Sequence, residues 1–140
     1  MNASRSFLAQ LTRHRIASYT AGSQHYQNYA KYDASVHPDL TKPQSELFQK
    51  IIEINMDNYN KLISMGVPKW EARQLLPNAM CTNILMTINA RSLINFLNLR
   101  LCNRNTDEIK IIAEKMHILV KKHLPELWEF IGPDCIIDKC

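Results

Sequence analysis

A cluster of basic side chains near the start of the chain is the first group of residues with evident chemistry. Arg13, His14 and Arg15 are consecutive and run into a segment of hydroxyl-bearing residues and glycine that includes Ser23. Guanidinium groups stay charged and bind phosphate through paired hydrogen bonds, so the arrangement suits an anionic ligand. The alternative is a short helix that ends in positive charge, because cations interact favourably with the C-terminal end of the helix dipole.

Arg100 stands out by its place on a predicted helix. At about 100° per residue it projects between Phe96 and Leu97, over Leu93. A guanidinium on an apolar face must reach water along its stem or meet an anion or carbonyl partner. The predicted apolar face of this helix consists of Ala90, Leu93, Ile94, Leu97 and Leu101.

Length and composition limit what the chain can be. Its 140 residues suffice for one domain with a core. Hydrophobic residues at 46% and charged residues at 21% are ordinary for a globular protein. The net charge of +4 fits an anionic small molecule as well as nucleic acid, but there is no basic tail. A nucleic-acid partner is therefore not favoured.

The cysteines and the hydropathy pattern predict neither a metal centre nor a membrane segment. The four cysteines form no Cys-x-x-Cys pair and no cluster with zinc spacing. Residues 1–12 lack the apolar run of a signal peptide, and no window approaches the roughly 18 apolar residues of a membrane helix. We expect a cytoplasmic protein whose thiols act mostly as small core side chains.

Proline, glycine and apolar spacing predict the elements of the first half of the chain. We expect a short helix over residues 5–15 and a long, partly ordered loop over residues 19–45, with or without a strand. A helical stripe then begins at Ser45 and ends at Gly66. It consists of Leu47, Ile51, Ile54, Asn58 and Leu62, with Phe48, Ile52, Tyr59 and Ile63 beside them.

The second half of the chain is predicted to be mainly helical. Pro68 suits the first turn of a helix that stops near Pro77. Residues 79–89 resemble an extended segment, residues 90–101 a helix, and residues 106–131 a longer helix. The pattern thus predicts four or five helices and little strand.

Two blocks of the sequence resemble the flavin-dependent thymidylate synthases. That family's signature is Arg-His-Arg, seven further residues and Ser, and RHRIASYTAGS at residues 13–23 matches it with the full spacing. A second block agrees in order: GVPKWEARQLLP at residues 66–77, followed by TINARSLINFLNLR at residues 87–100. The resemblance covers most of residues 5–120. It implies an α+β fold, mostly helical, with a small antiparallel sheet.

The resemblance also implies an activity. In that family FAD is reduced by NADPH, and the flavin relays a methylene group from methylenetetrahydrofolate to C5 of dUMP, which yields dTMP. No enzyme cysteine attacks the pyrimidine, so catalysis depends on holding anionic ligands close together. A homotetramer with sites between subunits is implied as well. We expect residues 1–140 to form one domain.

Individual positions match the family's ligand-binding residues. The residues that resemble dUMP contacts, with Arg100 as the catalytic candidate, are Gln10, Arg13, Ser23, His25, Arg73 and Arg100. Those that resemble FAD contacts are Arg13, His14, Arg15, Asn89, Arg91 and Asn95. Plain structural alternatives exist: Arg73 as a helix-surface residue, Asn89 as the N-cap of the next helix, and Asn95 as a solvent-facing side chain.

Several positions depart from the family pattern. The loop's usual Asn, Glu and Arg are replaced by Thr20, Ala21 and His25, and the later pattern His-Ala-Gln-x-Glu reads RNTDE at residues 104–108. A histidine is only partly charged near pH 7, so the Arg-to-His change weakens a phosphate clamp. Family members also carry a segment before the first helix. This chain has lost it, is a fragment, or assembles with something that supplies it.

Three hypotheses are open at this point. The first is a short, divergent flavin-dependent thymidylate synthase. The second keeps the fold and the nucleotide pocket but modifies another pyrimidine nucleotide, such as UMP. The third is a degenerate paralogue that binds nucleotide, flavin or a full-length partner without turnover. The lost Glu and Arg favour the third hypothesis, and the selective retention of the arginines opposes it.

Overall fold

The structure, a computed structural model, describes residues 1–26, 33–35 and 39–133. The chain divides into two units, of which the first comprises Met1–Ala9 and Thr20–Leu85 and the second Gln10–Tyr19 and Met86–Cys140. Among the described residues, no helix is long and apolar enough to cross a membrane. The same residues contain no group of three or more His, Cys, Asp or Glu side chains that could hold a metal ion.

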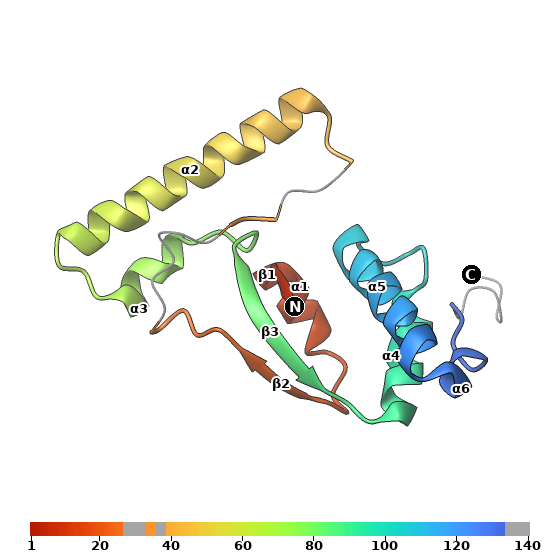
Figure 1. The fold of residues 1–140 in the computed structure, drawn as a ribbon. Helices are drawn as coiled ribbons and strands as arrows, with labels where there is room; N and C mark the ends of the chain where they lie inside the picture. The colour runs from red at the N-terminus through yellow and green to blue at the C-terminus, as the bar shows by residue number, and fades with distance from the viewer. Residues whose placement is uncertain (27–32, 36–38, 134–140) are drawn as a thin grey trace. The chain divides into compact units, whose positions relative to one another are not determined.

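A three-stranded sheet connects segments that are far apart in the sequence (Figure 1). The first strand, β1 (Asn2–Ser4), pairs antiparallel with β3 (Cys81–Thr87), with Asn2 opposite Asn83. The strand β2 (Ser18–Ala21) lies on the other side, so the order is β1-β3-β2. The mostly helical α+β fold with a small antiparallel sheet is thereby confirmed.

The sequence predicted the strands unevenly. The extended segment at residues 79–89 is confirmed as β3, and the 19–45 loop does contain part of β2. The strand β1 was not predicted, because three residues are too few to show an alternating pattern.

Helix α1 (Arg5–Leu11) ends earlier than the sequence predicted. The backbone N–H groups of Arg13 and His14 still donate to the carbonyls of Gln10 and Leu11, at 3.3 and 3.0 Å, in tight turns that close the helix end. The Leu11 carbonyl also accepts from the Tyr19 hydroxyl, which competes with continued helix. The last helical turn holds no basic residue, so the prediction of a helix ending in the Arg-His-Arg triplet is wrong.

Helix α2 (Lys42–Ser64) begins earlier than predicted and ends where predicted. Pro43 occupies its first turn, where a missing N–H costs nothing. The Gln44 side chain accepts a hydrogen bond from the Thr41 N–H at 2.9 Å. After the helix, Gly66 has a φ of 86°, a conformation that glycine adopts readily and other residues resist.

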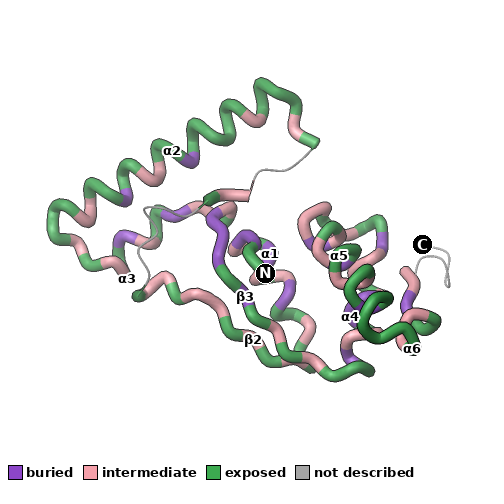
Figure 2. Tube along the Cα trace, viewed as in Figure 1, coloured by how far each residue is buried: buried purple, intermediate pink, exposed green. Residues whose placement is uncertain are grey.

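The apolar stripe predicted for α2 divides between two faces. Tyr59 is buried in a core cluster of the first unit with Ala72, Leu76 and Met80. The stripe positions Leu47, Ile51 and Ile54 are exposed, as is most of the helix in Figure 2. The first unit continues through α3 (Lys69–Ala72) and a short 3-10 helix (Arg73–Leu75), which confirm the predicted helix before Pro77.

The second unit contains helices α4 (Ala90–Arg100), α5 (Asp107–His123) and α6 (Pro125–Trp128). The single helix predicted over residues 106–131 is wrong. Leu124 has φ −140° and ψ 62°, because the residue before a proline is pushed out of the helical region.

The core of the second unit includes fully buried side chains from both long helices, namely Phe96, Leu97, Ile109 and Ala113. The buried face of α4 is therefore centred on Phe96 and Leu97, whereas Ala90, predicted to lie on the apolar face, is exposed. Cys81 and Cys102 are both buried, as expected, and Cys135 and Cys140 lie outside the described residues.

Candidate functional site

The turn that carries Arg13, His14 and Arg15 is held by Tyr19, within the second unit. The Tyr19 hydroxyl lies 2.6 Å from the carbonyl oxygen of His14 and 3.2 Å from that of Leu11. Burial raises the pKa of Tyr19, and the positive charge of Arg100 opposes this shift. The hydroxyl therefore stays protonated at neutral pH and can donate to these carbonyls.

His14 is a neutral side chain at neutral pH. Burial, and then the charge of Arg100, lower the pKa of His14 from its ordinary value of 6.5. The imidazole meets the edge of Phe96 with ring centroids 5.5 Å apart and an interplanar angle of 80°. Its Nε2 is buried and has no hydrogen-bond partner among the described residues. The triplet thus presents two positive charges and one neutral ring with an available nitrogen.

Arg100 is half-buried at the end of α4. One terminal nitrogen donates to Oδ1 of Asn105 at 3.3 Å, which settles one part of the question that the sequence left open: the guanidinium meets a carbonyl partner. Its Nε is buried and has no hydrogen-bond partner in the part of the chain that the structure describes. Because buried donors are normally paired, this atom needs an acceptor from outside that part.

Gln10 lies at the end of α1 and is tied to the start of α5. Its Oε1 accepts a hydrogen bond from the Thr106 hydroxyl at 3.0 Å, which leaves the amide nitrogen as the group that Gln10 can offer a ligand. Arg13 and Arg15 are exposed. The sequence did not predict the contacts of Thr106 or Asn105, because the path of the backbone determines which partners these side chains reach.

The start of α4 carries the remaining predicted flavin residues. Asn89 accepts from the Ser92 N–H at 2.9 Å, so the N-cap alternative is correct for its oxygen. Arg91 and Asn95 are exposed and lie one turn apart on the helix. An open depression of about 460 Å³ beside the helix start is lined by residues 16–18 and 87–89. The contact of these residues with flavin stays a prediction.

Three predicted dUMP residues lie in the first unit, and two of them, His25 and Arg73, contact Trp70. The His25 ring stacks on Trp70 with centroids 5.2 Å apart and 15° between the planes. Ser23 Oγ accepts from the His25 N–H at 3.2 Å, and Arg73 Nε donates to the Trp70 carbonyl at 3.0 Å. The sequence missed Trp70, although its place one turn before Arg73 was a usable signal.

Ser23 also opens onto a depression in the same unit. This depression holds about 470 Å³ and is lined by residues 20–23, Tyr26 and residues 83–85. Thr82 Oγ1 donates to the Gly22 carbonyl at 3.3 Å, and the Gly22 N–H donates to the Asn83 carbonyl at 3.1 Å. The loop that carries Ser23 is thereby attached to β3.

Comparison with known proteins adds a family to this geometry. The family model described as "Thymidylate synthase complementing protein" matches residues 1–126. The flavin-dependent thymidylate synthase of Saccharolobus solfataricus is 46% identical over 130 residues, which cover 91% of this chain and 50% of that protein. That of Geobacter sulfurreducens is 38% identical over 144 residues, covering 98% of this chain and 61% of the relative. The chain spans about half of the first relative's length.

A solved structure shares the fold. The UMP/dUMP methylase PolB from Streptomyces cacaoi, bound with 5-Br dUMP, superposes with a TM-score of 0.81 at 23% identity, over 92% of this chain and 68% of that one. At that identity the likeness shows the fold alone. The family model and the relatives confirm the resemblance seen in the sequence, and the chain belongs to the flavin-dependent thymidylate synthase family.

Proposed function

We propose that the protein acts in the FAD-dependent methylation of dUMP to dTMP, with methylenetetrahydrofolate and NADPH, and that residues 1–140 serve as one functional domain. Membership of the family supports this proposal. The observation that carries it is a pair of buried nitrogen atoms in the second unit, His14 Nε2 and Arg100 Nε, which have no hydrogen-bond partner among the described residues. A ligand in contact with these two atoms would supply the partners that buried polar groups normally have.

Arg100 is the proposed catalytic residue. Its guanidinium stays charged, and the Asn105 contact engages only one of its nitrogen atoms. A pyrimidine nucleotide offers carbonyl and phosphate oxygens that the remaining donors can bind. A fixed positive charge beside the pyrimidine favours negative charge that develops on the ring as C5 takes up the one-carbon unit. Gln10 and Arg13 are the neighbouring proposed dUMP contacts in this unit.

The residues proposed for FAD fit a ligand that combines a polar ring system with a pyrophosphate. Arg13, Arg15 and Arg91 are exposed cations suited to phosphate oxygens, and the neutral His14 offers Nε2 to a ring heteroatom. Asn89, the N-cap of α4, and Asn95, within α4, add amide groups on the helix that carries Arg91. When bound, FAD would supply the redox chemistry that accompanies transfer of the one-carbon unit from the folate.

In the first unit, the proposed dUMP contacts are Ser23, His25 and Arg73. The stack on Trp70 fixes the plane of the His25 ring, so this side chain can present a nitrogen in a defined direction. The Ser23 hydroxyl accepts from a backbone N–H and keeps its own proton for an acceptor on the ligand. Arg73 retains its terminal nitrogens, because the Trp70 carbonyl engages Nε.

We also propose that the protein is a homotetramer of the cytoplasm. The exposed apolar face of α2, which holds Leu47, Ile51 and Ile54, supports an assembly through this helix. The buried Cys81 and Cys102 are consistent with a reducing compartment.

The proposal is tested with the purified protein in excess FAD. We expect co-purifying or added flavin to give bound-flavin absorbance, and NADPH oxidation to depend on dUMP and to yield dTMP. The Arg100→Met variant should retain bound flavin and lose dUMP-dependent turnover. Normal turnover by that variant would contradict the role of Arg100.

A substrate panel separates the alternatives. Turnover of UMP in place of dUMP would favour the second hypothesis, and dCMP serves as a further comparison. PolB, which shares the fold, is named as a UMP/dUMP methylase. Absence of turnover, together with no thermal stabilisation by FAD and dUMP, would favour the degenerate paralogue.

A further inference from the structure

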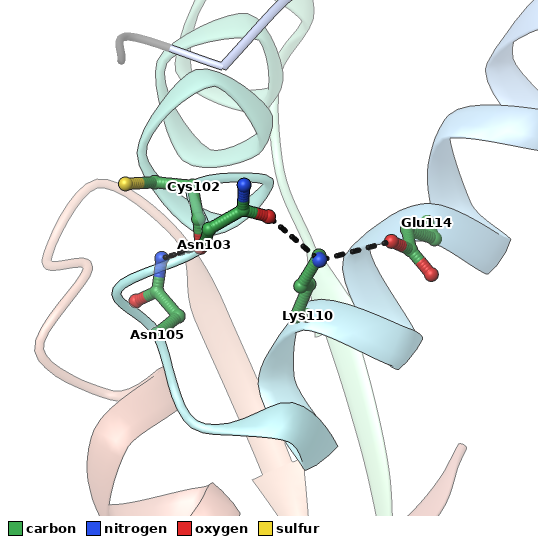
Figure 3. A network of polar contacts seen from close by, with 5 residues as sticks. All are labelled: Cys102, Asn103, Asn105, Lys110 and Glu114. Atoms are coloured by element: carbon green, nitrogen blue, oxygen red, sulfur yellow. Dashed lines mark hydrogen bonds and ion pairs between the residues drawn. The ribbon is translucent and has the colours of Figure 1, made fainter. Parts of the chain in front are cut away.

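Asn105, in the segment between α4 and α5, contacts both Arg100 and the end of α4. Its Nδ2 donates to the carbonyls of Leu99 at 2.7 Å and Cys102 at 3.1 Å. Its Oδ1 accepts from the Arg100 guanidinium at 3.3 Å. Figure 3 shows the Asn105 side chain turned back toward Cys102.

These contacts determine which way the Asn105 amide faces. Carbonyl oxygens accept and do not donate, so the two backbone partners require the NH₂ group on their side. The amide oxygen must then face Arg100. A single side chain therefore caps the last turn of α4 and restrains the guanidinium that this turn carries.

Thr106 acts in a similar way on Gln10. It is the N-cap residue of α5, where a hydroxyl normally accepts from a backbone N–H of the first turn. Here the hydroxyl donates instead to Gln10 Oε1 at 3.0 Å. With Oε1 engaged by Thr106, the amide nitrogen is the group that Gln10 can offer a ligand.

The connecting segment is itself attached to α5. Lys110 Nζ donates to Asn103 Oδ1 at 2.7 Å and lies 3.9 Å from Glu114 Oε1 (Figure 3). Among the contacts of the described residues, neither Asn103 nor Lys110 is hydrogen-bonded to Arg100 or Gln10. They provide a matched control, because they stabilise the same segment without contacting the proposed ligand residues.

We propose that Asn105 and Thr106 are positioning residues, which set the direction in which Arg100 and Gln10 present their donors to the pyrimidine nucleotide. This inference rests on the proposed function for the identity of the ligand. The two residues stand where the sequence departs from the pattern that the family resemblance implies. Their effect on the nucleotide is indirect and passes through the side chains they hold.

Titration of His14 in the absence of ligand tests whether Asn105 positions Arg100. Because the charge of Arg100 contributes to the lowered pKa of His14, the imidazole proton signals of His14 in NMR report where the guanidinium lies. Asn105→Ala should raise the pKa of His14 in the direction that Arg100→Met raises it. Asn103→Ala, the matched control, should leave the titration unchanged. An unchanged titration in Asn105→Ala would overturn the proposal for Arg100.

Double-mutant cycles test whether Asn105 and Thr106 affect dUMP binding through Arg100 and Gln10. Asn105→Ala should weaken dUMP binding roughly tenfold, a usual size for coupling between contacting residues, and should have no further effect in the Arg100→Met background. Thr106→Val should weaken binding only while Gln10 is present, and Thr106→Ser should restore it. A loss that persists without Arg100 or Gln10 would show that these residues only stabilise the segment.

The outcomes separate this inference from the proposed function. If the wild-type protein binds no dUMP while Asn105→Ala still shifts the His14 titration, the nucleotide role is overturned and the positioning of Arg100 is supported. Melting temperatures identify a variant that fails to fold. Thr106→Val then provides the independent test, because it changes an exposed side chain of nearly the same shape.

Discussion

Local hydrogen bonds decide what each proposed ligand residue can still offer. The Asn89 oxygen is engaged by the Ser92 N–H, and Arg73 Nε by the Trp70 carbonyl. Arg100 Nε and His14 Nε2 are buried without a hydrogen-bond partner in the described ranges. Asn89 therefore keeps its amide nitrogen for a ligand, and Arg73 keeps its terminal nitrogens. In the second unit, Arg100 Nε and His14 Nε2 are available as well.

The first prediction concerns Tyr19, which holds the Arg-His-Arg turn. Tyr19→Phe removes the hydroxyl that contacts the carbonyls of Leu11 and His14. The free energy of unfolding should fall by about 1 kcal/mol, the usual net contribution of such a bond. Urea denaturation measures this change, and flavin affinity should fall with it because the turn loosens.

Tyr26→Phe provides the control for this prediction, since Tyr26 is 79% exposed and its hydroxyl makes no hydrogen bond to the described residues. It should leave the free energy of unfolding unchanged. Equal stability of Tyr19→Phe and the wild type would show that the hydroxyl does not hold the turn.

The sequence predicted the arginines of the candidate site but not the residues that contact or support them. Arg13, Arg15 and Arg100 are recognisable because guanidinium groups at motif spacing indicate anion binding. Asn105 and Tyr19 act through backbone carbonyls, and any hydroxyl or amide could make such bonds. Only the path of the backbone determines which of them do.

At the level of the elements, proline shows why helix boundaries were harder to predict than helices. Pro43 belongs to the segment 19–45 that the sequence predicts to be a loop, yet it lies in the first turn of α2. Pro125 belongs to the single helix predicted over residues 106–131, yet it separates α5 from α6. The residue type is the same in both cases. Its effect depends on whether preceding residues are already helical, which apolar spacing does not determine.

Gly66 gives a prediction at the end of α2. Its φ of 86° lies in the left-handed region, and an added Cβ would meet no atom within 4 Å. Gly66→Ala should therefore lower the free energy of unfolding by about 1 kcal/mol through backbone strain alone. Thermal or chemical denaturation measures the change.

Gly132→Ala is the matched control for Gly66→Ala. The space around Gly132 is equally open, and its φ lies outside the left-handed region. This variant should be close to neutral. Similar losses in both variants would show that something other than the backbone conformation of Gly66 is responsible.

The contact between α5 and α6 predicts a dependence of stability on pH. The His117 ring stacks on Trp128 at 3.9 Å and 13°, with Lys121 Nζ 4.5 Å from the same indole. Burial, and then the charge of Lys121, lower the pKa of His117 below its ordinary value of 6.5. The unfolded chain binds this proton more readily, so stability should fall as the pH drops from above 6.5 through the folded pKa.

His117→Phe should keep the stack on Trp128 and remove the titration. The melting temperature of this variant should therefore fall less than that of the wild type between about pH 7.5 and about pH 5. His14, whose pKa is also lowered, keeps its contribution in both proteins and cancels in the comparison. Parallel curves for the two proteins would contradict the role of His117.

At the level of the whole molecule, α2 has more apolar surface than the described residues cover. Leu47 is 60% exposed, Ile51 50% and Ile54 49%, although they belong to one predicted stripe. The sequence predicted this helix correctly, but apolar spacing does not distinguish a face that meets the chain's own core from one that meets another copy.

The proposed tetramer predicts the effect of a charge on this face. Ile51→Glu should reduce the oligomeric state and leave the fold of the subunit intact, because Ile51 is exposed within it. Analytical ultracentrifugation measures the assembly, and circular dichroism checks the fold. Asn60→Glu, on the opposite side of α2, should leave the assembly unchanged. A monomeric wild type would contradict the proposal.

The order of the strands has a consequence for how the chain reaches its fold during synthesis. Both outer strands are made before β3, to which each of them pairs, and Thr82 lies 60 positions after Gly22, its partner through Oγ1. Until β3 leaves the ribosome, β1 and β2 have no sheet to join, and closing such long loops is slow. The sheet should therefore form late, and a nascent chain that stops before Cys81 should expose two strands open to aggregation.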